Sequence, residues 1–447
     1  MTMEKKWADL SPEEKREERF NWWLSPPDVQ FVSLEAEKAY KIRVQRLIDV
    51  YKVQEPDRVP VSLPFGALPA YLYGTDYRTV MYDYHKAAQA WMKFNKEFET
   101  DYLISPAMVL PGKVYELLDY KLYTWPGHGM PESSNGYQYV EGEYMKEDEY
   151  DALITDPSGF LTRVFMPRAF GALQPFSMLQ STVSVIELPT FYLMPYAMPP
   201  VQAAQQALID AGKELSEWMG SILQFTKQGM ELGFPPMASG AFCKAPFDTL
   251  GDTLRGTKGI MMDMYRQPDK MVKAMDVLAD MTIHSVISTV NANRSLAAIF
   301  PLHKGADGWM SDKQFSTLYW PSLKKIIDPL ISEGILIILF AEGGFNTRLE
   351  SVNEFPKGAV HWMFDRTDMA KGKKILGDKC SISGNVPASL LVAGTPQEVK
   401  EYCRNLIGIC GKGGGYMLAP GTADITEARP ENVRAMIEAA KEYGVYK

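Results

Sequence analysis

Polar side chains follow three short apolar runs in segment 334–387. Glu342 lies just after the first run, Asp365 directly after the second and Asn385 shortly after the third. Apolar runs of this length, alternating with helix-like stretches, predict buried parallel strands in repeated β–α units. In a (β/α)8 barrel the carboxyl ends of the strands surround one mouth, where the chemistry takes place. We therefore expect these three side chains to face one mouth. The runs are Ile335–Phe340, Ala359–Phe364 and Cys380–Ile382.

Glu342 is the first candidate for acid–base chemistry. A carboxyl group that follows an apolar strand is costly to bury without a partner. Loss of water around it raises its pKa towards neutrality, where it can donate or accept a proton. The alternative is a structural ion pair of Glu342 with Arg348 or Arg366.

Two histidines accompany this carboxyl group. His303 lies just past the apolar run Ala297–Leu302, and polar residues on loops at strand ends are frequently functional. His361 lies inside a predicted strand, so its side chain faces either the barrel interior or the surrounding helices. We predict Glu342, His303 and His361 as catalytic residues. The predicted substrate- or cofactor-binding residues are Asp307, Asp365, Asn385 and Asn346.

Metal and phosphate sites are not indicated by the pattern. The four cysteines are scattered, and Cys403 and Cys410 lie on a predicted packed helix, so no convergent zinc ligand set is visible. A nucleophilic Cys–His pair stays open but has no support. The glycines of Gly411–Gly415 follow a helix instead of joining a strand to one, which indicates helix termination and not a phosphate loop.

Composition excludes several function classes. The chain has 447 residues, 23% of them charged, with a net charge of -8, which argues against nucleic-acid and anionic-membrane partners. It has no apolar run of 18 residues and no apolar core in its first 27, so we expect neither a membrane span nor a signal peptide. Few cysteines favour the cytoplasm. The 25 Met and 23 Tyr residues indicate either an apolar pocket or a large core.

The remaining pattern predicts one α/β domain. We expect a helical N-terminal extension at 1–55, a single barrel at 56–447 and an irregular insertion after the second strand, at about 107–200. Four prolines in Glu187–Pro200 forbid a continuous helix there, which leaves a lid, a subunit contact or a loop packed on the barrel. Further expected strands are Arg58–Leu63, Tyr102–Ser105, Pro236–Ala241, Ala297–Leu302 and Gly415–Leu418. Expected helices are Leu34–Val53, Arg78–Glu99, Val201–Leu232, Gln267–Ser288, Phe315–Ser332, Asn346–Asn353, Thr367–Leu376, Pro396–Cys410 and Pro430–Tyr443.

Five stretches in the same order resemble the uroporphyrinogen decarboxylase superfamily, which includes the corrinoid-linked methyltransferases. They are AFCKAPFDTLGDTLRG (Ala241–Gly256), KGIMMDMYRQPDKM (Lys258–Met271), LFAEGG (Leu339–Gly344), SISGNVPASLLVAGTPQEV (Ser381–Val399) and GGYMLAPG with RPENV (Gly414–Val433). The resemblance covers roughly residues 40–447. It implies a distorted (β/α)8 TIM barrel with the site at its mouth.

The chain departs from both branches of that superfamily. True decarboxylases have an arginine-rich loop after the first strand, where this chain has Pro64–Leu68, and their catalytic Asp and His fall at about Pro106 and Pro420. The zinc methyltransferases have His and Cys where this chain has Phe340 and Glu342, and a second Cys at Thr422. We therefore expect no porphyrinogen decarboxylation and no zinc.

The resemblance implies a cobalamin- or corrinoid-dependent methyltransferase subunit. It would move a methyl group between a small, apolar or aromatic molecule and a corrinoid, for example in a demethylation. The corrinoid would be bound directly by this chain or carried by a partner corrinoid protein. One alternative is a decarboxylase or lyase of a different substrate, for which Lys304 and Arg348 offer only a thin positive clamp. The other is a non-catalytic binding subunit. We also consider a homodimer.

Overall fold

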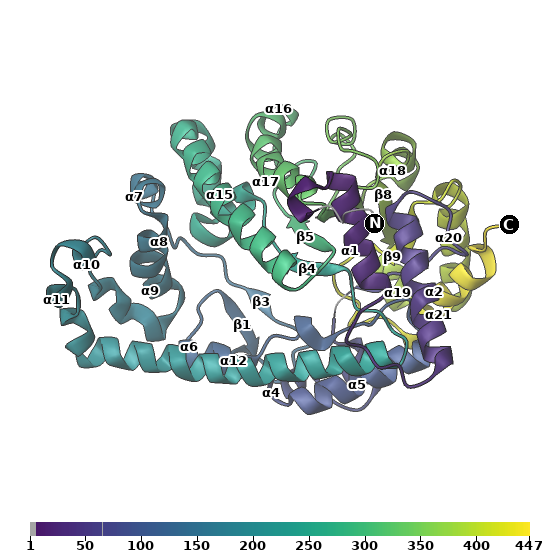
Figure 1. Cartoon of the computed structure of the whole chain (residues 1–447), viewed down its shortest axis with the longest axis horizontal. Coiled ribbons are helices and arrows are strands. Elements are labelled where there is room, and N and C mark those ends of the chain that lie inside the picture. Colours follow the sequence, from purple (N-terminus) through teal and green to yellow (C-terminus); the bar gives the residue numbers. More distant parts are fainter. Residues whose placement is uncertain (1–5, 65) are drawn as a thin grey trace.

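A computed structural model describes residues 6–64 and 66–447, and its centre is a six-stranded parallel sheet. Neighbouring strands are consecutive in the chain, and helices connect them on the outside (Figure 1). Every residue of β5 and β6 is buried, as expected for strands covered on both faces. The strands are β4 (Ser239–Phe242), β5 (Ala297–Leu302), β6 (Leu336–Ala341), β7 (Val360–Phe364), β8 (Ser381–Val386) and β9 (Tyr416–Pro420).

Two irregular segments lie at the edges of this sheet, in the places expected for the first two strands. Val61 forms a single parallel bridge with Leu418 of β9, and Leu103 forms one with Pro236 before β4. Side chains join the two segments, since Asp101 accepts a hydrogen bond from the Val61 amide at 2.8 Å. The prediction of regular strands at 58–63 and 102–105 was therefore wrong, because nearby prolines lack the amide that a ladder needs. The barrel is distorted at this point.

Long helices cover the outside of the sheet (Figure 1). The predicted bounds of α20 and α21 are confirmed, and α20 begins with a capping box between Thr395 and Glu398. The principal helices are α12 (Pro199–Glu231), α14 (Gly256–Arg266), α15 (Pro268–Ala292), α17 (Trp320–Ser332), α18 (Met369–Leu376), α20 (Pro396–Cys410) and α21 (Pro430–Tyr443). Shorter ones are α3 (Leu68–Leu72), α13 (Pro246–Asp248), α16 (Asp312–Gln314) and α19 (Ala388–Ala393).

Two predicted helices differ from the structure. The segment Arg78–Glu99 is divided into α4 (Tyr77–Tyr82) and α5 (Tyr84–Phe98), because the Asp83 side chain accepts a hydrogen bond from the Lys86 amide and caps α5. The segment Asn346–Asn353 forms turns and not a helix.

The helical N-terminal region is confirmed by α1 (Pro12–Leu24) and α2 (Leu34–Tyr51). The Arg19 guanidinium donates hydrogen bonds to the Ser295 and Glu333 carbonyls, which precede β5 and β6. Helix α1 therefore covers the end of the barrel opposite to the mouth.

The insertion forms an arm beside the barrel. It contains a small sheet of β1 (Tyr123–Pro126), β2 (Gly129–Met130) and β3 (Gln138–Tyr139). Figure 1 shows α10 and α11 at the tip of the arm, next to the start of α12. The break in regular helix at the prolines is confirmed, because this region forms only short helical turns. The short helices are α6 (Gly112–Leu118), α7 (Tyr150–Thr155), α8 (Pro157–Phe160), α9 (Met166–Ala169), α10 (Ser184–Glu187) and α11 (Pro189–Tyr192).

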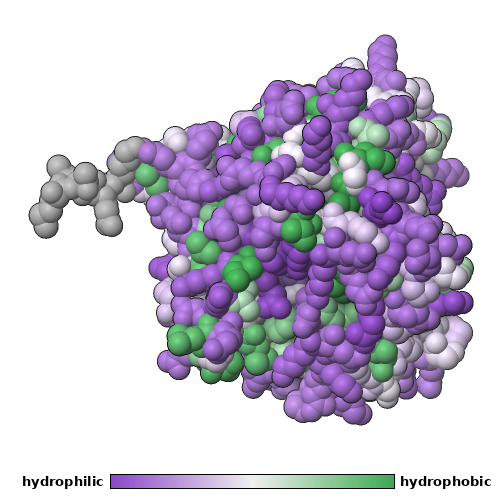
Figure 2. All heavy atoms as spheres, turned by 90° about the vertical axis from the view of Figure 1, so that its right-hand side faces the viewer, coloured by the Kyte–Doolittle hydropathy of each residue, from purple (hydrophilic) through white to green (hydrophobic). Residues whose placement is uncertain are grey.

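The surface of the molecule is largely polar where Figure 2 shows it, with small separate apolar clusters. Among the described residues, helices of sufficient length lack the apolarity needed to cross a membrane.

Candidate active site

Three ionisable side chains, Asp252, His303 and Glu342, form a row that begins in the segment after β4 and ends at the barrel mouth. His303 lies just after β5 and Glu342 just after β6, so the sheet places them side by side. The His303 Nδ1 atom is 2.5 Å from Asp252 Oδ2, and its Nε2 atom is 3.7 Å from Glu342 Oε1. This order, carboxylate–imidazole–carboxyl, can hold a proton and move it towards the mouth.

Asp252 is the buried end of this row. Burial alone would raise the pKa of its carboxyl group, but His303, Lys244 and Lys304 together lower that pKa below its usual range. The Lys304 ammonium is 3.0 Å from Asp252 Oδ1, and the Lys244 ammonium is 3.2 Å from Oδ2. Asp252 therefore stays ionised and fixes the orientation of the imidazole.

Asp248 fixes the loop that follows β5. It is fully buried and accepts hydrogen bonds from the His303 amide at 3.0 Å and the Lys304 amide at 2.9 Å. The Tyr319 hydroxyl donates a third bond at 2.7 Å. Because one carboxylate binds two successive amides, the position of the His303 backbone is determined by Asp248.

The surroundings shift the pKa values of His303 and Glu342 upward. Burial lowers the pKa of His303, but the hydrogen bond and charge of Asp252 outweigh it and raise that pKa above its ordinary value. Removal from water raises the pKa of Glu342, against the opposing charge of His303. Both groups therefore bind a proton more readily than in water, which is a property of acid–base pairs in active sites.

A cleft of about 660 Å³ opens at the carboxyl ends of β6 to β9, and Glu342 lines it. Asp365 and Asn385 line it too, so the structure brings together the three residues first selected from the sequence. The Asp365 carboxylate accepts a hydrogen bond from the Gly343 amide, and the Asn385 amide group donates to the Asp365 and Thr367 carbonyls. These bonds position the loops, while both side chains remain at the cleft wall.

Asp307 and Asn346 hold the backbone of the loops. The Asp307 carboxylate accepts hydrogen bonds from the amides of Asn346 at 2.6 Å and Thr347 at 3.3 Å. The side-chain Oδ1 atom of Asn346 accepts one from the Asp368 amide. Neither residue lines the cleft. The hydrogen bonds give both residues a loop-positioning role, and their predicted binding role stays a prediction.

His361 lies away from Glu342, inside the barrel. Its two ring nitrogens lie 2.9 Å from the Ser381 hydroxyl and 3.0 Å from the Ser383 hydroxyl, and burial lowers its pKa to about 3. The prediction that it assists Glu342 was wrong, because strand β7 places its side chain towards the serines of β8. At neutral pH it is an uncharged core residue.

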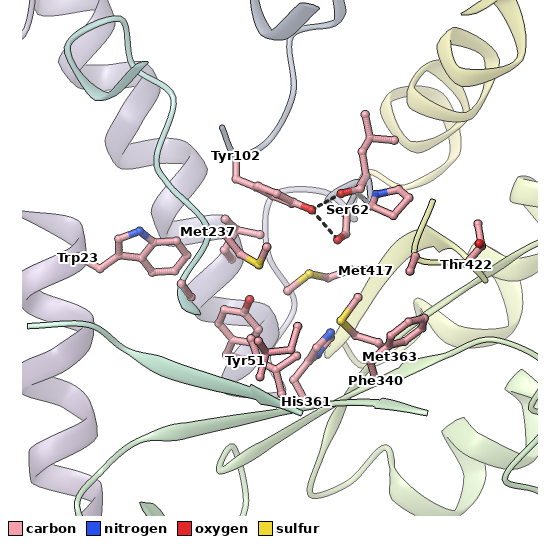
Figure 3. Close-up of a pocket in the computed structure, with 17 residues that line it drawn as sticks. Trp23, Tyr51, Ser62, Tyr102, Met237, Phe340, His361, Met363, Met417 and Thr422 are labelled. Atoms are coloured by element: carbon pink, nitrogen blue, oxygen red, sulfur yellow. Dashed lines mark hydrogen bonds between the residues drawn. The ribbon is translucent and has the colours of Figure 1, made fainter. Parts of the chain in front are cut away.

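His361 lines a narrow internal cavity of about 50 Å³ beneath the mouth. Figure 3 shows its ring near Tyr51 and the sulfur-bearing side chains of Met363 and Met417, with the Tyr102 hydroxyl near Ser62. Phe340 and Thr422 line both this cavity and the outer cleft, so they separate the two. Part of the methionine content therefore lines this small cavity.

The structural alternative for Glu342 is not supported. Arg348 pairs instead with Asp312 and lies 3.9 Å from Asp307, whereas Arg366 pairs with Asp365 at 3.7 Å. The partner of Glu342 is His303, and the Glu342 side chain is 40% exposed towards the cleft.

The sequence analysis did not select Asp248, Asp252 or Lys244, although all three lie in the family-like stretch 241–256. The carboxyl groups of Asp248 and Asp252 are four residues apart and follow a strand, and this spacing could have indicated a functional site. They lie in a π-helical turn at Thr249–Leu254 and its preceding residues, a feature frequent at functional sites.

The cysteines have no catalytic geometry. All four are free and buried, and burial raises the pKa of each thiol to about 12. Within the described ranges, no group of three or more His, Cys, Asp or Glu side chains is placed to bind a metal ion. The expectation of no zinc stays a prediction. The glycines after α20 form a left-handed turn that ends the helix, as predicted.

The model of the uroporphyrinogen decarboxylase (URO-D) family matches residues 195–443, which is more than half of the chain. The chain belongs to this family. The match includes β4 to β9 and every residue of the Asp252–His303–Glu342 row. The acid–base residues therefore lie in the family's own domain and outside most of the insertion.

Individual relatives are distant. The uroporphyrinogen decarboxylases of Cellvibrio japonicus and Hydrogenovibrio crunogenus are 28% and 31% identical, over 39% and 40% of this chain. The chain spans about half the length of these relatives, 49% and 50%. The solved structure of a methyltransferase from Methanosarcina mazei is similar to this chain, with a TM-score of 0.55 and 15% identity, over 90% of this chain and 98% of that one. That likeness shows a shared fold.

Proposed function

We propose that this protein is a corrinoid-dependent methyltransferase subunit that acts on a small, apolar or aromatic methyl compound. The observation that carries the proposal is the position of Glu342, at the cleft end of a hydrogen-bonded Asp252–His303 pair. The methyltransferase with a similar fold supports it. The free, buried cysteines support a reducing, cytoplasmic location.

The reaction needs a proton donor at the leaving heteroatom. When a methyl–oxygen bond breaks, its electron pair stays on oxygen, and a proton delivered there lowers the barrier. Glu342 would deliver this proton to the substrate, and His303 would supply Glu342 from its Nε2 atom. Asp252 would stabilise the imidazole in its charged form. A corrinoid, when bound, supplies the cobalt that exchanges the methyl group.

The donor groups at the mouth fit a corrinoid presented by a partner protein. The His361 imidazole lies inside the barrel between two serine hydroxyls. The His303 imidazole is held by Asp252, with its Nε2 atom 3.7 Å from Glu342. We therefore assign neither imidazole as a cobalt ligand. The open rim of the cleft has the exposed Arg366 and the hydroxyl of Ser389, which would hydrogen bond to the carboxamides of a corrin ring.

The decarboxylase alternative has weaker support. Of the two residues suggested as a positive clamp, Lys304 is buried against Asp252, and Arg348 is 1% exposed and paired with Asp312. Neither is free to bind a substrate carboxylate. The third possibility, a non-catalytic binding subunit, predicts no methyl transfer. A turnover that depends on Glu342 would therefore exclude it in favour of the methyltransferase.

The direct test incubates the purified protein with reduced cobalamin and a panel of methyl aryl ethers, and follows the absorbance of methylcobalamin. We expect methyl transfer from at least one ether. Absence of both transfer and corrinoid binding, also with a corrinoid protein added, would contradict the proposal.

We predict no activity on uroporphyrinogen. The cleft has Glu342 and Asp365 at its wall, and Arg366 is its one described arginine and already has a carboxylate partner. A substrate with many carboxylates would be repelled. Chromatography of porphyrins after incubation should show unchanged uroporphyrinogen, and formation of coproporphyrinogen would overturn this prediction.

We predict an alkaline limb in the pH profile of methyl transfer. Protonated His303 supplies the proton that Glu342 delivers. Because Asp252 raises the pKa of His303, activity should persist above pH ~6.5, the ordinary imidazole value, and should fall as His303 deprotonates. In Asp252→Asn this pKa falls, so the limb should move to lower pH. Asp252→Glu keeps the charge and should keep the limb. An unmoved limb in a folded Asp252→Asn protein would remove His303 from the proton path.

A further inference from the structure

The outer face of α12 has a repeating apolar pattern with no covering element. One side of this 33-residue helix is buried, at Val201, Ala204 and Phe225 among others. On the opposite side Ile209 is 52% and Leu223 is 63% exposed, with Ser216 between them. Positions 209, 212, 216, 220 and 223 all lie within about 40° of one line along the helix, at about 100° per residue, and we call this line the seam. Figure 1 shows α12 running along one edge of the molecule.

This seam is symmetric about Ser216. Gly212 and Gly220 lie four residues to either side, and Ile209 and Leu223 lie seven. A methyl group added at either glycine would meet no neighbouring atom, which shows that the face is open. A two-fold interface requires one surface to be complementary to itself. A palindromic stripe on a straight helix meets this condition for an antiparallel partner.

We propose that α12 pairs with α12 of a second copy of this chain, antiparallel, about a two-fold axis at Ser216. Ile209 then contacts Leu223 of the partner subunit, and the small residues allow the two backbones to approach. This inference is independent of the proposed methyl transfer, because no residue of the seam lines the mouth.

The charges beside the seam are complementary in this arrangement. At about 100° per residue, Lys213 and Glu217 lie on one side of the seam, and Leu215 and Met219 lie on the other. The two-fold axis brings the same side of both helices together. Lys213 therefore lies near Glu217 of the partner subunit, and the apolar pair Leu215 and Met219 lies near its own copy.

Exposed apolar residues also lie near both ends of α12, where an antiparallel pair would bring them together. At its start, the tip of the arm exposes Phe191 and Ile186, the latter by 79%. At its end, the Val32 amide donates to the Glu231 carbonyl, and Val32 and Leu34 are exposed. An antiparallel pair brings the arm tip of one subunit to Val32 and Leu34 of the partner subunit.

The size of this surface suits a stable dimer. A helix of 33 residues is about 50 Å long and about 10–12 Å wide, giving a strip of roughly 500–600 Å². The arm tip adds to it, approaching the ~800 Å² per subunit of standard interfaces.

Sedimentation and light scattering test the proposal. The wild-type chain should have a mass of about 100 kDa, twice its 50.3 kDa, at micromolar concentration. Ser216→Glu places two carboxylates on the two-fold axis and should give a monomer with unchanged circular dichroism. Gln228→Glu, an exposed change on the same helix about 120° from the seam, should stay dimeric. A monomeric wild type, or a dimer that tolerates Ser216→Glu, would overturn the proposal.

Cross-linking tests the orientation, since all four native cysteines are buried. A short bis-maleimide should join Ile209→Cys to Leu223→Cys in a mixture of the two variants. Ile209→Cys alone should stay unlinked, because its two copies lie about 21 Å apart along the axis. Linking of Ile209→Cys to itself would exclude the antiparallel arrangement.

Discussion

In the Glu342→Gln variant we expect methyl-transfer turnover to fall by about 10²–10⁴, the range for one positioned acid or base. Glutamine has nearly the same shape and hydrogen-bonding reach but cannot release a proton. Substrate affinity and melting temperature should change little, since Glu342 is partly exposed and its one close ionic partner among the described residues is His303 at 3.7 Å. Single-turnover absorbance measurements on one preparation separate affinity from chemistry.

The matched control for this experiment is Glu438→Gln. Glu438 lies on α21 and forms an exposed ion pair with Lys400, so its substitution should leave turnover and stability nearly unchanged. Near wild-type turnover in Glu342→Gln would retire Glu342 as the acid. His303 would then be the leading candidate, because it is the next ionisable group behind it.

The Asp248→Ala variant should lose about 3 kcal/mol or more of folding free energy, because three buried donors lose their acceptor and each costs roughly 1–3 kcal/mol. The substitution leaves the amides of His303 and Lys304 and the Tyr319 hydroxyl without their acceptor. We expect a melting temperature lowered by several degrees, measured by differential scanning calorimetry. Turnover should fall as well, because the His303 backbone loses its support.

Asp280→Ala is the control for stability. Asp280 forms an exposed ion pair with Lys325 at 3.1 Å, and such pairs contribute about 0–1 kcal/mol. An Asp248→Ala protein as stable as this control would show that solvent or neighbouring groups replace the lost carboxylate, and would contradict the positioning role of Asp248.

The sequence by itself determined the existence of strands β5 to β9 and placed Glu342 and Asp365 directly after two of them. Asn385 lies inside the observed β8, because that strand continues four residues past the predicted end at Ile382. Buried parallel strands need continuous apolar residues, so a polar residue at the end of such a run is visible without coordinates. Because parallel strands end at one edge, Glu342, Asp365 and Asn385 were correctly placed at one mouth. His303 was selected by the same argument. The helical N-terminal region and the bounds of α20 and α21 followed equally from local pattern.

Only the tertiary structure decided which partner each polar group has. Asp252 and His303 are 51 residues apart in the chain, and nothing local shows that Asp252 approaches the imidazole at 2.5 Å. His361 could face either side of its strand, and the packing of β7 on β8 gave it two serines instead of Glu342. Asp307 has the same chemistry whether it binds a ligand or a backbone amide, so its loop-holding role was invisible until the loops were in place. Local pattern fixes burial and strand ends, whereas hydrogen-bond partners depend on contacts that are distant in the chain.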